Sequence, residues 1–127
     1  MNKKTVLIID DSLTVRQQVG LTLRSAGYQI LEACDGLEGV AAMQNHAELN
    51  MVLCDLNMPR MNGLEFLDTI KRDGAGPPVP VIMLTTDGSP ELISRAKRSG
   101  AKGWIVKPFQ ADMLLAAVRR IAGDPNS

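Results

Sequence analysis

A short apolar run ends in a single carboxylate in the sequence MVLCDLNMP, which occupies residues 51–59. The part from Met51 to Asp55 is continuously apolar up to the acid, which is typical of a strand buried on both faces of a parallel sheet. A polar turn follows and leads through Pro59 and Gly63 into a helical pattern. Open α/β sheets build their sites where strands end in this way, so Asp55 is the centre of the candidate site.

On either side of this stretch, segments with strand character alternate with helical patterns. The predicted strands are residues 5–9, 28–33, 51–55, 79–85 and 103–106, and a helical pattern follows each of them. The strand at 28–33 is short and less apolar, which favours a place near an edge of the sheet. The alternation predicts an α/β fold, namely a doubly wound parallel sheet with helices on both faces. It does not by itself set the order of the strands.

Local signals mark the start of two helices and the position of one loop. Asn62, followed by Glu65 three residues later, resembles a capping box with Asn as the cap. Ser89-Pro90-Glu91 is a strong helix opening, with a cap, a proline at the first position and an acid in the first turn. Residues 73–78 read DGAGPP and predict a loop.

Length and composition predict one domain without a charge bias. The chain has 127 residues, 45% of them hydrophobic, and we expect a single domain over 1–127 with a core at about 4–122 and a flexible tail at 123–127. Lys and Arg number 14 and Asp and Glu also number 14, so we expect no general affinity for nucleic acid or for an anionic membrane. No signal peptide or membrane-spanning run is visible. We expect a cytoplasmic protein in which Cys34 and Cys54 are reduced, buried thiols.

The chemistry-bearing side chains follow the predicted strands. In such a fold the carboxyl ends of all strands open on one edge, where we expect the side chains of Asp10, Asp11, Asp55, Thr85 and Lys107. Three carboxylates at one edge repel one another, and Lys107 with a hard divalent cation would compensate them. Mg²⁺ suits this set because it takes a few carboxylate oxygens and keeps waters. The backbone carbonyl of a turn residue, Asn57, could add a ligand.

A carboxylate can also accept a phosphoryl group as an acyl phosphate, which makes Asp55 a candidate phosphoacceptor. The cation and Lys107 would balance the phosphoryl oxygens, and Thr85 would offer them a hydroxyl hydrogen bond. Each residue alone has a simpler interpretation: helix caps for Asp10 and Asp11, a turn acid, a strand-end hydroxyl and an exposed lysine. Their joint position at four strand ends favours the phosphoryl-acceptor site.

These residues lie in motifs by which the chain resembles the response-regulator receiver domain over nearly its whole length. The matching segments are residues 8–12 (IIDDS), 55–59 (DLNMP) with 62–63 (NG), 83–86 (MLTT) and 103–109 (GWIVKPF). The LTTD and WIVKPF segments favour the stand-alone chemotaxis receivers of the CheY type. The resemblance implies a flavodoxin-like (CheY-like) five-stranded sheet with the order 2-1-3-4-5.

The resemblance also implies how the site works. A sensor histidine kinase would donate from phosphohistidine to Asp55, Thr85 would move toward the phosphoryl group and Lys107 would pair with it. The Lys107–Pro108 bond would be cis. The implied Mg²⁺ ligands are Asp10, Asp11, Asp55 and the backbone carbonyl of Asn57.

The implied output surface consists of the fourth helix, the fifth strand and the fifth helix. Trp104 stands where the family carries an aromatic residue coupled to Thr85. An indole is bulkier than the usual side chains there, so Trp104 as a moving switch and Trp104 as a partly exposed platform for a partner both stay open. Asn57 and Asp87 lie where the family tunes hydrolysis of the acyl phosphate.

The leading function is a binding switch that engages a motor or a kinase in chemotaxis or motility, as a phosphoacceptor and not an enzyme, and as a monomer or a weak phospho-dependent dimer. The alternatives are a phosphate sink, a phosphorelay shuttle, or the receiver part of a longer regulator. A phosphatase with an aspartyl intermediate would need a second acid where Asn57 stands. A flavodoxin-like cofactor binder would need a phosphate loop after the first strand.

Overall fold

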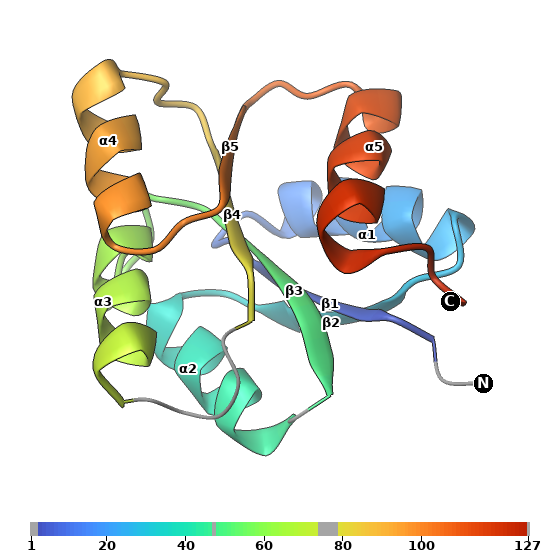
Figure 1. Cartoon of the computed structure of the whole chain (residues 1–127), viewed down its shortest axis with the longest axis horizontal. Coiled ribbons are helices and arrows are strands. Elements are labelled where there is room, and N and C mark those ends of the chain that lie inside the picture. Colours follow the sequence, from blue (N-terminus) through green and yellow to red (C-terminus); the bar gives the residue numbers. More distant parts are fainter. Residues whose placement is uncertain (1–2, 47, 74–78, 127) are drawn as a thin grey trace.

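Five parallel strands form one sheet in the order β2-β1-β3-β4-β5 (Figure 1). The strands are β1 (Thr5–Ile9), β2 (Gln29–Ala33), β3 (Leu49–Cys54), β4 (Val81–Thr85) and β5 (Gly103–Val106). This is the doubly wound order that was expected, and the less apolar β2 does lie at an edge. The computed structural model describes residues 3–46, 48–73 and 79–126.

Helices cover both faces of the sheet. They are α1 (Leu13–Ser25), α2 (Gly36–Asn45), α3 (Gly63–Asp73), α4 (Pro90–Arg98) and α5 (Ala111–Ala122). Figure 1 shows α1 and α5 on one side of the sheet and α2, α3 and α4 on the other. The two layers enclose separate apolar cores, since Val19 and Leu114 belong to one cluster of buried side chains and Phe66 and Ala96 to the other.

The strand β1 feeds both cores because successive side chains of a strand point to opposite faces. Val6 and Ile8 pack with α1 and α5, whereas Leu7 and Ile9 pack on the side of α2 and α3. All four are at most 1% exposed. Full burial of such side chains stabilises the fold by roughly 1.5–3 kcal/mol each, which explains why the strand has no polar alternation.

Four strand ends differ from the prediction by one or two residues. β4 begins at Val81 and not at residue 79, and β3 ends at Cys54, so Asp55 directly follows the strand. The reasons for the other two differences are identifiable. β3 begins at Leu49, before the polar Asn50, because the pairing of β1 with β3 shifts register there and the Asn50 Oδ1 accepts a 2.8 Å hydrogen bond from the Thr5 N–H. β2 begins one residue after Tyr28, whose ring is buried in the core next to α1 and α5. The predicted loop at 73–78 lies, apart from the backbone of Asp73, outside the described residues.

The C-terminal residues after α5 are tied to the body of the fold as far as Asn126 is described. The Tyr28 hydroxyl donates a 2.7 Å hydrogen bond to the Gly123 carbonyl, and the Lys4 N–H donates a 2.8 Å bond to the Pro125 carbonyl. We expected a flexible tail from residue 123, and these contacts lie within its described part. Ser127 is outside the described residues.

The two cysteines are both free, but only one is buried. Cys54 is fully buried in β3, as expected, whereas Cys34 after β2 is partly exposed. The prediction of a buried thiol is therefore wrong for Cys34. This residue follows β2, the edge strand of the sheet, and its side chain is partly exposed there.

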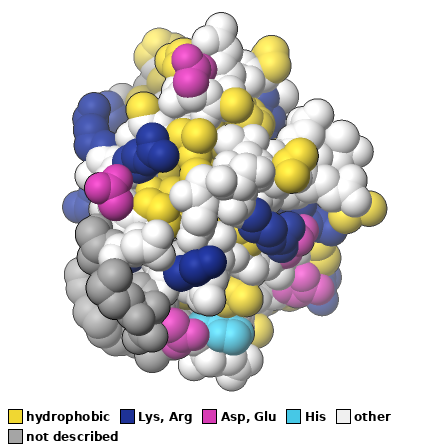
Figure 2. All heavy atoms as spheres, turned by 90° about the vertical axis from the view of Figure 1, so that its right-hand side faces the viewer, with side chains coloured by type: hydrophobic (Ala, Val, Ile, Leu, Met, Phe, Trp, Pro, Cys, Tyr) yellow, Lys and Arg dark blue, Asp and Glu magenta, His cyan; other side chains and the backbone are white. Residues whose placement is uncertain are grey.

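The surface carries its charges in a mixed pattern. On the face that holds α1 and α5, basic, acidic and hydrophobic side chains alternate over short distances (Figure 2). No helix within the described residues combines the length and the apolar character that crossing a membrane requires.

Candidate functional site

The parallel pairing of β1 with β3 brings the first two acids together. Ile9 pairs with Cys54 at the ends of the two strands, so the next residues, Asp10 and Asp55, leave the sheet side by side. The backbone continues this alignment, because the Asp55 N–H donates a 2.8 Å hydrogen bond to the Ile9 carbonyl. Two apolar strands that end in register therefore place two carboxylates at one point of the sheet edge.

Asp11 completes an acidic cluster with Asp10 and Asp55. One carboxylate oxygen from each of the three lies within 4.8 Å of the others. Asp10 and Asp55 are buried, at 2% and 8% exposure, whereas Asp11 faces solvent. Two buried carboxylates and one exposed carboxylate thus lie within a few ångströms of one another, and their negative charges repel.

Lys107 reaches this cluster from the end of β5. Its Nζ lies 2.7 Å from Oδ2 of Asp10 and 3.5 Å from Oδ2 of Asp55. The Lys107 N–H donates a 2.8 Å hydrogen bond to the Thr85 carbonyl, and the Lys107–Pro108 peptide bond is cis. The ammonium, only 14% exposed, supplies part of the positive charge that the acids require.

The acidic cluster is still short of positive charge. Burial raises the pKa of Asp55 above its ordinary value, and the neighbouring Asp10 raises it further. Lys107, the Leu56 N–H and the Thr85 hydroxyl act in the opposite direction without cancelling these effects. Additional positive charge at this point would therefore favour the ionised form of Asp55.

The donor set fits a hard divalent cation. All three side chains offer carboxylate oxygens, the ligands that Mg²⁺ prefers, and the exposed Asp11 leaves one side open to the waters that Mg²⁺ retains. Asn57 lies two residues after Asp55 in an exposed position of the loop between β3 and α3. Its carbonyl as a further ligand stays a prediction.

Thr85 lies beside this cluster at the end of β4, and Trp104 lies on the neighbouring strand β5, paired with Met83. Thr85 is completely buried, and its hydroxyl is 3.5 Å from the Asp87 N–H. The Trp104 indole is partly buried against the core on the side of α2, α3 and α4 and donates a 3.1 Å hydrogen bond from Nε1 to the Asp87 carbonyl. Asp87 in the loop after β4 thus contacts both the Thr85 hydroxyl and the indole.

Four contacts in and around the site were not predicted from the sequence. The Arg16 guanidinium donates a 2.6 Å hydrogen bond to the Asp10 carbonyl and a 3.0 Å bond to Glu32 on β2. The Ser12 N–H donates a 2.9 Å bond to Oδ1 of Asp10. Arg60, after Asn57 in the same loop, pairs with Asp35 at the start of α2. Only the Ser12 contact could have been anticipated, because an Asp often binds the N–H two residues later.

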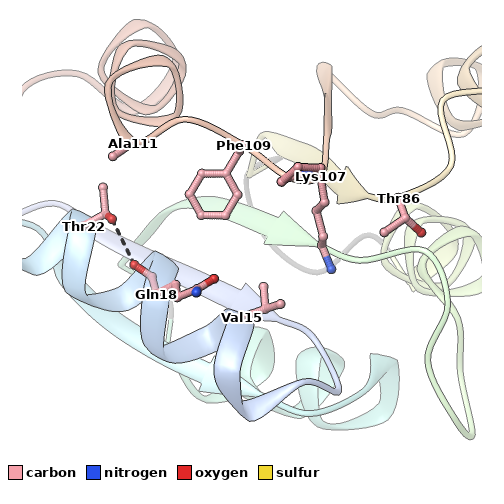
Figure 3. Close-up of a pocket in the computed structure, with 8 residues that line it drawn as sticks. Val15, Gln18, Thr22, Thr86, Lys107, Phe109 and Ala111 are labelled. Carbon is pink, nitrogen blue, oxygen red and sulfur yellow. Dashed lines mark hydrogen bonds between the residues drawn. The ribbon is translucent and has the colours of Figure 1, made fainter.

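A groove of about 550 Å³ runs from Lys107 along α1 (Figure 3). In this view Phe109 lies between α5 and α1, and Val15 and Gln18 line the groove from α1, across from Phe109. The residues that line the groove are Val15, Gln18, Thr22, Thr86, Lys107, Pro108, Phe109 and Ala111. Of the residues that converge at the acidic cluster, Lys107 is the one that also lines this groove.

Comparison with known proteins identifies the family. The family model for the response regulator receiver domain matches residues 6–119. The chain is 34% identical to the chemotaxis protein CheY1 of Helicobacter pylori over 93% of this chain and 96% of that protein. It is similar in structure to the chemotaxis response regulator CheY4 of Vibrio cholerae, with a TM-score of 0.87, 39% identity and coverage of 94% and 99% of the two chains.

A second similar structure is that of a complex with ligands. It is the CheX-CheY-BeF3-Mg complex of Borrelia burgdorferi, with a TM-score of 0.85, 32% identity and coverage of 93% of this chain and 88% of that chain.

Proposed function

We propose that this chain, which belongs to the response regulator receiver domain family, accepts a phosphoryl group on Asp55 from a sensor histidine kinase and thereby switches a partner-binding surface. Family membership rests on the match over residues 6–119. The observation that carries the phosphoryl chemistry is the convergence of Asp10, Asp11, Asp55 and Lys107 within a few ångströms at one sheet edge.

In the proposed reaction an oxygen of Asp55 attacks the phosphorus atom of a phosphohistidine. A phosphorus–oxygen bond forms to Asp55 and the phosphorus–nitrogen bond to the imidazole breaks, with its electron pair returning to the imidazole nitrogen. Oδ1 of Asp55 accepts a 2.7 Å hydrogen bond from the Leu56 N–H, and Oδ2 faces the Lys107 ammonium. The side chain is therefore held in one orientation, which lowers the cost of aligning it with the donor.

Asp10, Asp11, Asp55 and the carbonyl of Asn57 would hold Mg²⁺. When bound, the ion supplies positive charge that neutralises the phosphoryl oxygens during transfer. Asp10 lies 2.7 Å from the Lys107 ammonium, and the exposed Asp11 gives the ion a route from solvent. The Lys107 ammonium, 3.5 Å from Asp55, is close enough to pair with a phosphoryl group there.

The proposed switch couples Asp55 to α4, β5 and α5. Thr85 is the last residue of β4. Burial and Asp10 have the larger effects on the pKa of Asp55 and raise it, whereas the Thr85 hydroxyl has a smaller effect and lowers it. The two side chains therefore interact before any phosphoryl group is present. A phosphoryl group would draw the Thr85 hydroxyl and alter the loop whose Asp87 carbonyl binds Trp104. The family match and the CheY relatives support a downstream motor or kinase as the partner, in chemotaxis or motility.

The proposal also covers the activity of the chain itself, its location in the cell and its oligomeric state. The chain acts as a phosphoacceptor that promotes its own phosphorylation and dephosphorylation, in the cytoplasm, as a monomer or a weak phospho-dependent dimer. The CheX-CheY structure of Borrelia burgdorferi, which holds BeF3 and Mg, supports the choice of both reagents for a test.

Fluorescence of Trp104 with Mg²⁺ and then beryllofluoride, a mimic of the acyl phosphate, tests the proposal. Trp104 is the only tryptophan in the chain, so the signal has one source. We expect a change with Mg²⁺, a further change with beryllofluoride only when Mg²⁺ is present, and loss of the second change in Asp55→Asn. If the fluorescence does not change, calorimetry measures the binding of Mg²⁺ and beryllofluoride directly. If neither binds, the proposal is contradicted.

A further inference from the structure

The loop that carries Asn57 contains the only described residue other than glycine with a positive φ. Arg60 has a φ of 64°, in the left-handed region that a side chain with a Cβ rarely adopts. Such a conformation persists only where surrounding contacts impose it. The contact that Arg60 makes is with Asp35, 25 residues earlier in the chain.

The Arg60–Asp35 contact is a close ion pair with a buried carboxylate. Nε and a terminal nitrogen of the guanidinium each lie 2.6 Å from Oδ2 of Asp35, which is 2% exposed. Oδ1 of Asp35 accepts a 2.9 Å hydrogen bond from the Glu38 N–H and so caps α2. Both oxygens of Asp35 are therefore engaged, and the position of the carboxylate is set by the helix.

A second contact joins the same two segments. The Gly36 N–H donates a 3.0 Å hydrogen bond to the Met61 carbonyl. The approach requires glycine, because a Cβ at Gly36 would lie 2.6 Å from Cγ and 2.7 Å from the carbonyl oxygen of Met61. Two consecutive loop residues thus bind two consecutive residues at the start of α2.

The other end of the loop is closed on the sheet. The Gly63 N–H donates a 2.9 Å hydrogen bond to the Leu56 carbonyl, directly after Asp55. Asn57 lies between this closure and Arg60, in an exposed position. The course of the backbone at Asn57 is therefore determined from both sides, by the sheet at Leu56 and by α2 through Arg60.

We infer that Arg60 is a positioning residue for the metal site: its ion pair with Asp35 holds the loop whose Asn57 carbonyl would join Asp10, Asp11 and Asp55 as a ligand of the cation. This inference rests on the proposed function, because it concerns the same Mg²⁺ site. Arg60 touches none of the reacting atoms and acts through the backbone of residues 57–60. Outer-shell groups bonded directly to a metal ligand change the metal affinity by about 10–100-fold when removed, and we expect the lower end of this range for Arg60, which acts through the backbone.

The test is the affinity for Mg²⁺ of Arg60→Gly, measured by calorimetry and by Trp104 fluorescence. Glycine adopts a positive φ without strain, so the variant removes the ion pair while permitting the same backbone. We expect Mg²⁺ to bind about tenfold more weakly. Electrostatics alone predicts the opposite, since removal of a positive charge near three carboxylates strengthens the attraction for a cation. The sign of the change therefore separates positioning from simple charge.

Two further variants sharpen this measurement. Arg60→Lys keeps the charge but lacks the planar fork of the guanidinium, and we expect an affinity between those of the wild type and Arg60→Gly. Asp35→Asn retains an oxygen for the Glu38 N–H and removes the charge that holds Arg60. Arg60→Gly and Asp35→Asn each break the same ion pair. The variant that combines them should therefore bind Mg²⁺ no more weakly than the weaker of the two single variants.

Arg98→Ala, at the exposed end of α4, is the control for the loss of one basic side chain and should leave the affinity within twofold of the wild type. An Arg60→Gly protein that binds Mg²⁺ within twofold of the wild type, or more tightly, overturns the inference and leaves the proposed function intact. Failure of the unchanged chain to bind Mg²⁺ overturns both. Urea unfolding of each variant establishes that the folded protein is being titrated.

Discussion

The Lys107 ammonium donates a 2.7 Å hydrogen bond to Oδ2 of Asp10, although 97 residues separate them in the chain. The same nitrogen is 3.5 Å from Oδ2 of Asp55, so Lys107 bridges two buried carboxylates. The Lys107 ammonium therefore lies close to the position that a cation bound by these acids would occupy. The protein therefore carries an internal positive charge that stabilises the acidic cluster and would compete with a metal ion bound there.

Lys107→Met should increase the affinity for Mg²⁺ by about tenfold, because the substitution removes a unit charge that lies within a few ångströms of the metal site. Methionine preserves most of the aliphatic stem. The same variant should show a weaker Trp104 response to beryllofluoride, since the phosphoryl mimic loses its ammonium partner. Calorimetric titration with Mg²⁺ measures the first effect, and fluorescence the second.

Lys102→Met is the matched control, because Lys102 is exposed just before the opposite end of β5. It should leave both measurements unchanged. An affinity for Mg²⁺ that is equal or lower in Lys107→Met would contradict the competing role of Lys107.

Asp55→Asn should stabilise the metal-free protein at neutral pH. Burial and then Asp10 raise the pKa of Asp55, so the folded state holds the proton more tightly than the unfolded state. Stability is then lost as the pH rises from the ordinary pKa of aspartate, about 3.9, to the raised value in the folded state. Asparagine removes that loss, and we expect a gain on the order of 1 kcal/mol.

Urea unfolding without Mg²⁺ at neutral pH and near pH 4 measures this difference between Asp55→Asn and the wild type. The difference should shrink at the lower pH, where the aspartate takes up its proton in both states. A variant that is less stable than the wild type at neutral pH would show that Asp55 is not under electrostatic strain.

Gly63→Ala should destabilise the fold and disturb the acidic cluster together. A Cβ at this position would collide with the Asp55 carbonyl and would lie 2.6 Å from Cε of Met83. Because the carbonyl belongs to the sheet edge and cannot move freely, we expect a loss of about 2–3 kcal/mol in the free energy of unfolding. Urea unfolding measures the loss, and Mg²⁺ titration should show weaker binding.

Gly20→Ala in α1 provides the comparison for the same change at a tolerant position. Its nearest neighbour would be the flexible end of Arg24, with Nη1 at 3.2 Å. Alanine favours a helix over glycine by up to about 1 kcal/mol, so this variant should be at least as stable as the wild type. Equal losses in the two variants would mean that the contact with Asp55 is not the cause.

Asn62→Ala should cost about 1 kcal/mol of stability, because it removes the cap of α3. The Asn62 Oδ1 accepts a 2.9 Å hydrogen bond from the Glu65 N–H, and the Asn62 N–H donates a 3.0 Å bond to Oε1 of Glu65. Asn62→Ser keeps a capping oxygen and should recover most of the loss in urea unfolding. If the serine and alanine variants are equally destabilised, the capping bond does not contribute.

The capping box also shows what the sequence determined. Asn62 and Glu65 are three residues apart, and their reciprocal bonds need only the geometry of one helical turn. The strands were likewise recognisable from continuous apolar runs, because a strand buried on both faces requires them. Once the strands are parallel, their carboxyl ends must share an edge, so the meeting of Asp10 with Asp55 followed from local patterns and one topological rule.

The tertiary structure alone decided features that depend on partners distant in the chain. The predicted strand began at Met51, yet β3 includes Asn50, whose side chain bonds to Thr5 at an irregularity between β1 and β3. Arg60, in the loop after β3, adopts a strained φ because a buried carboxylate at the start of α2 binds it. Neither residue has a local motif, since propensity describes a residue and its near neighbours. The bonds of these side chains exist only after the sheet and helices have packed.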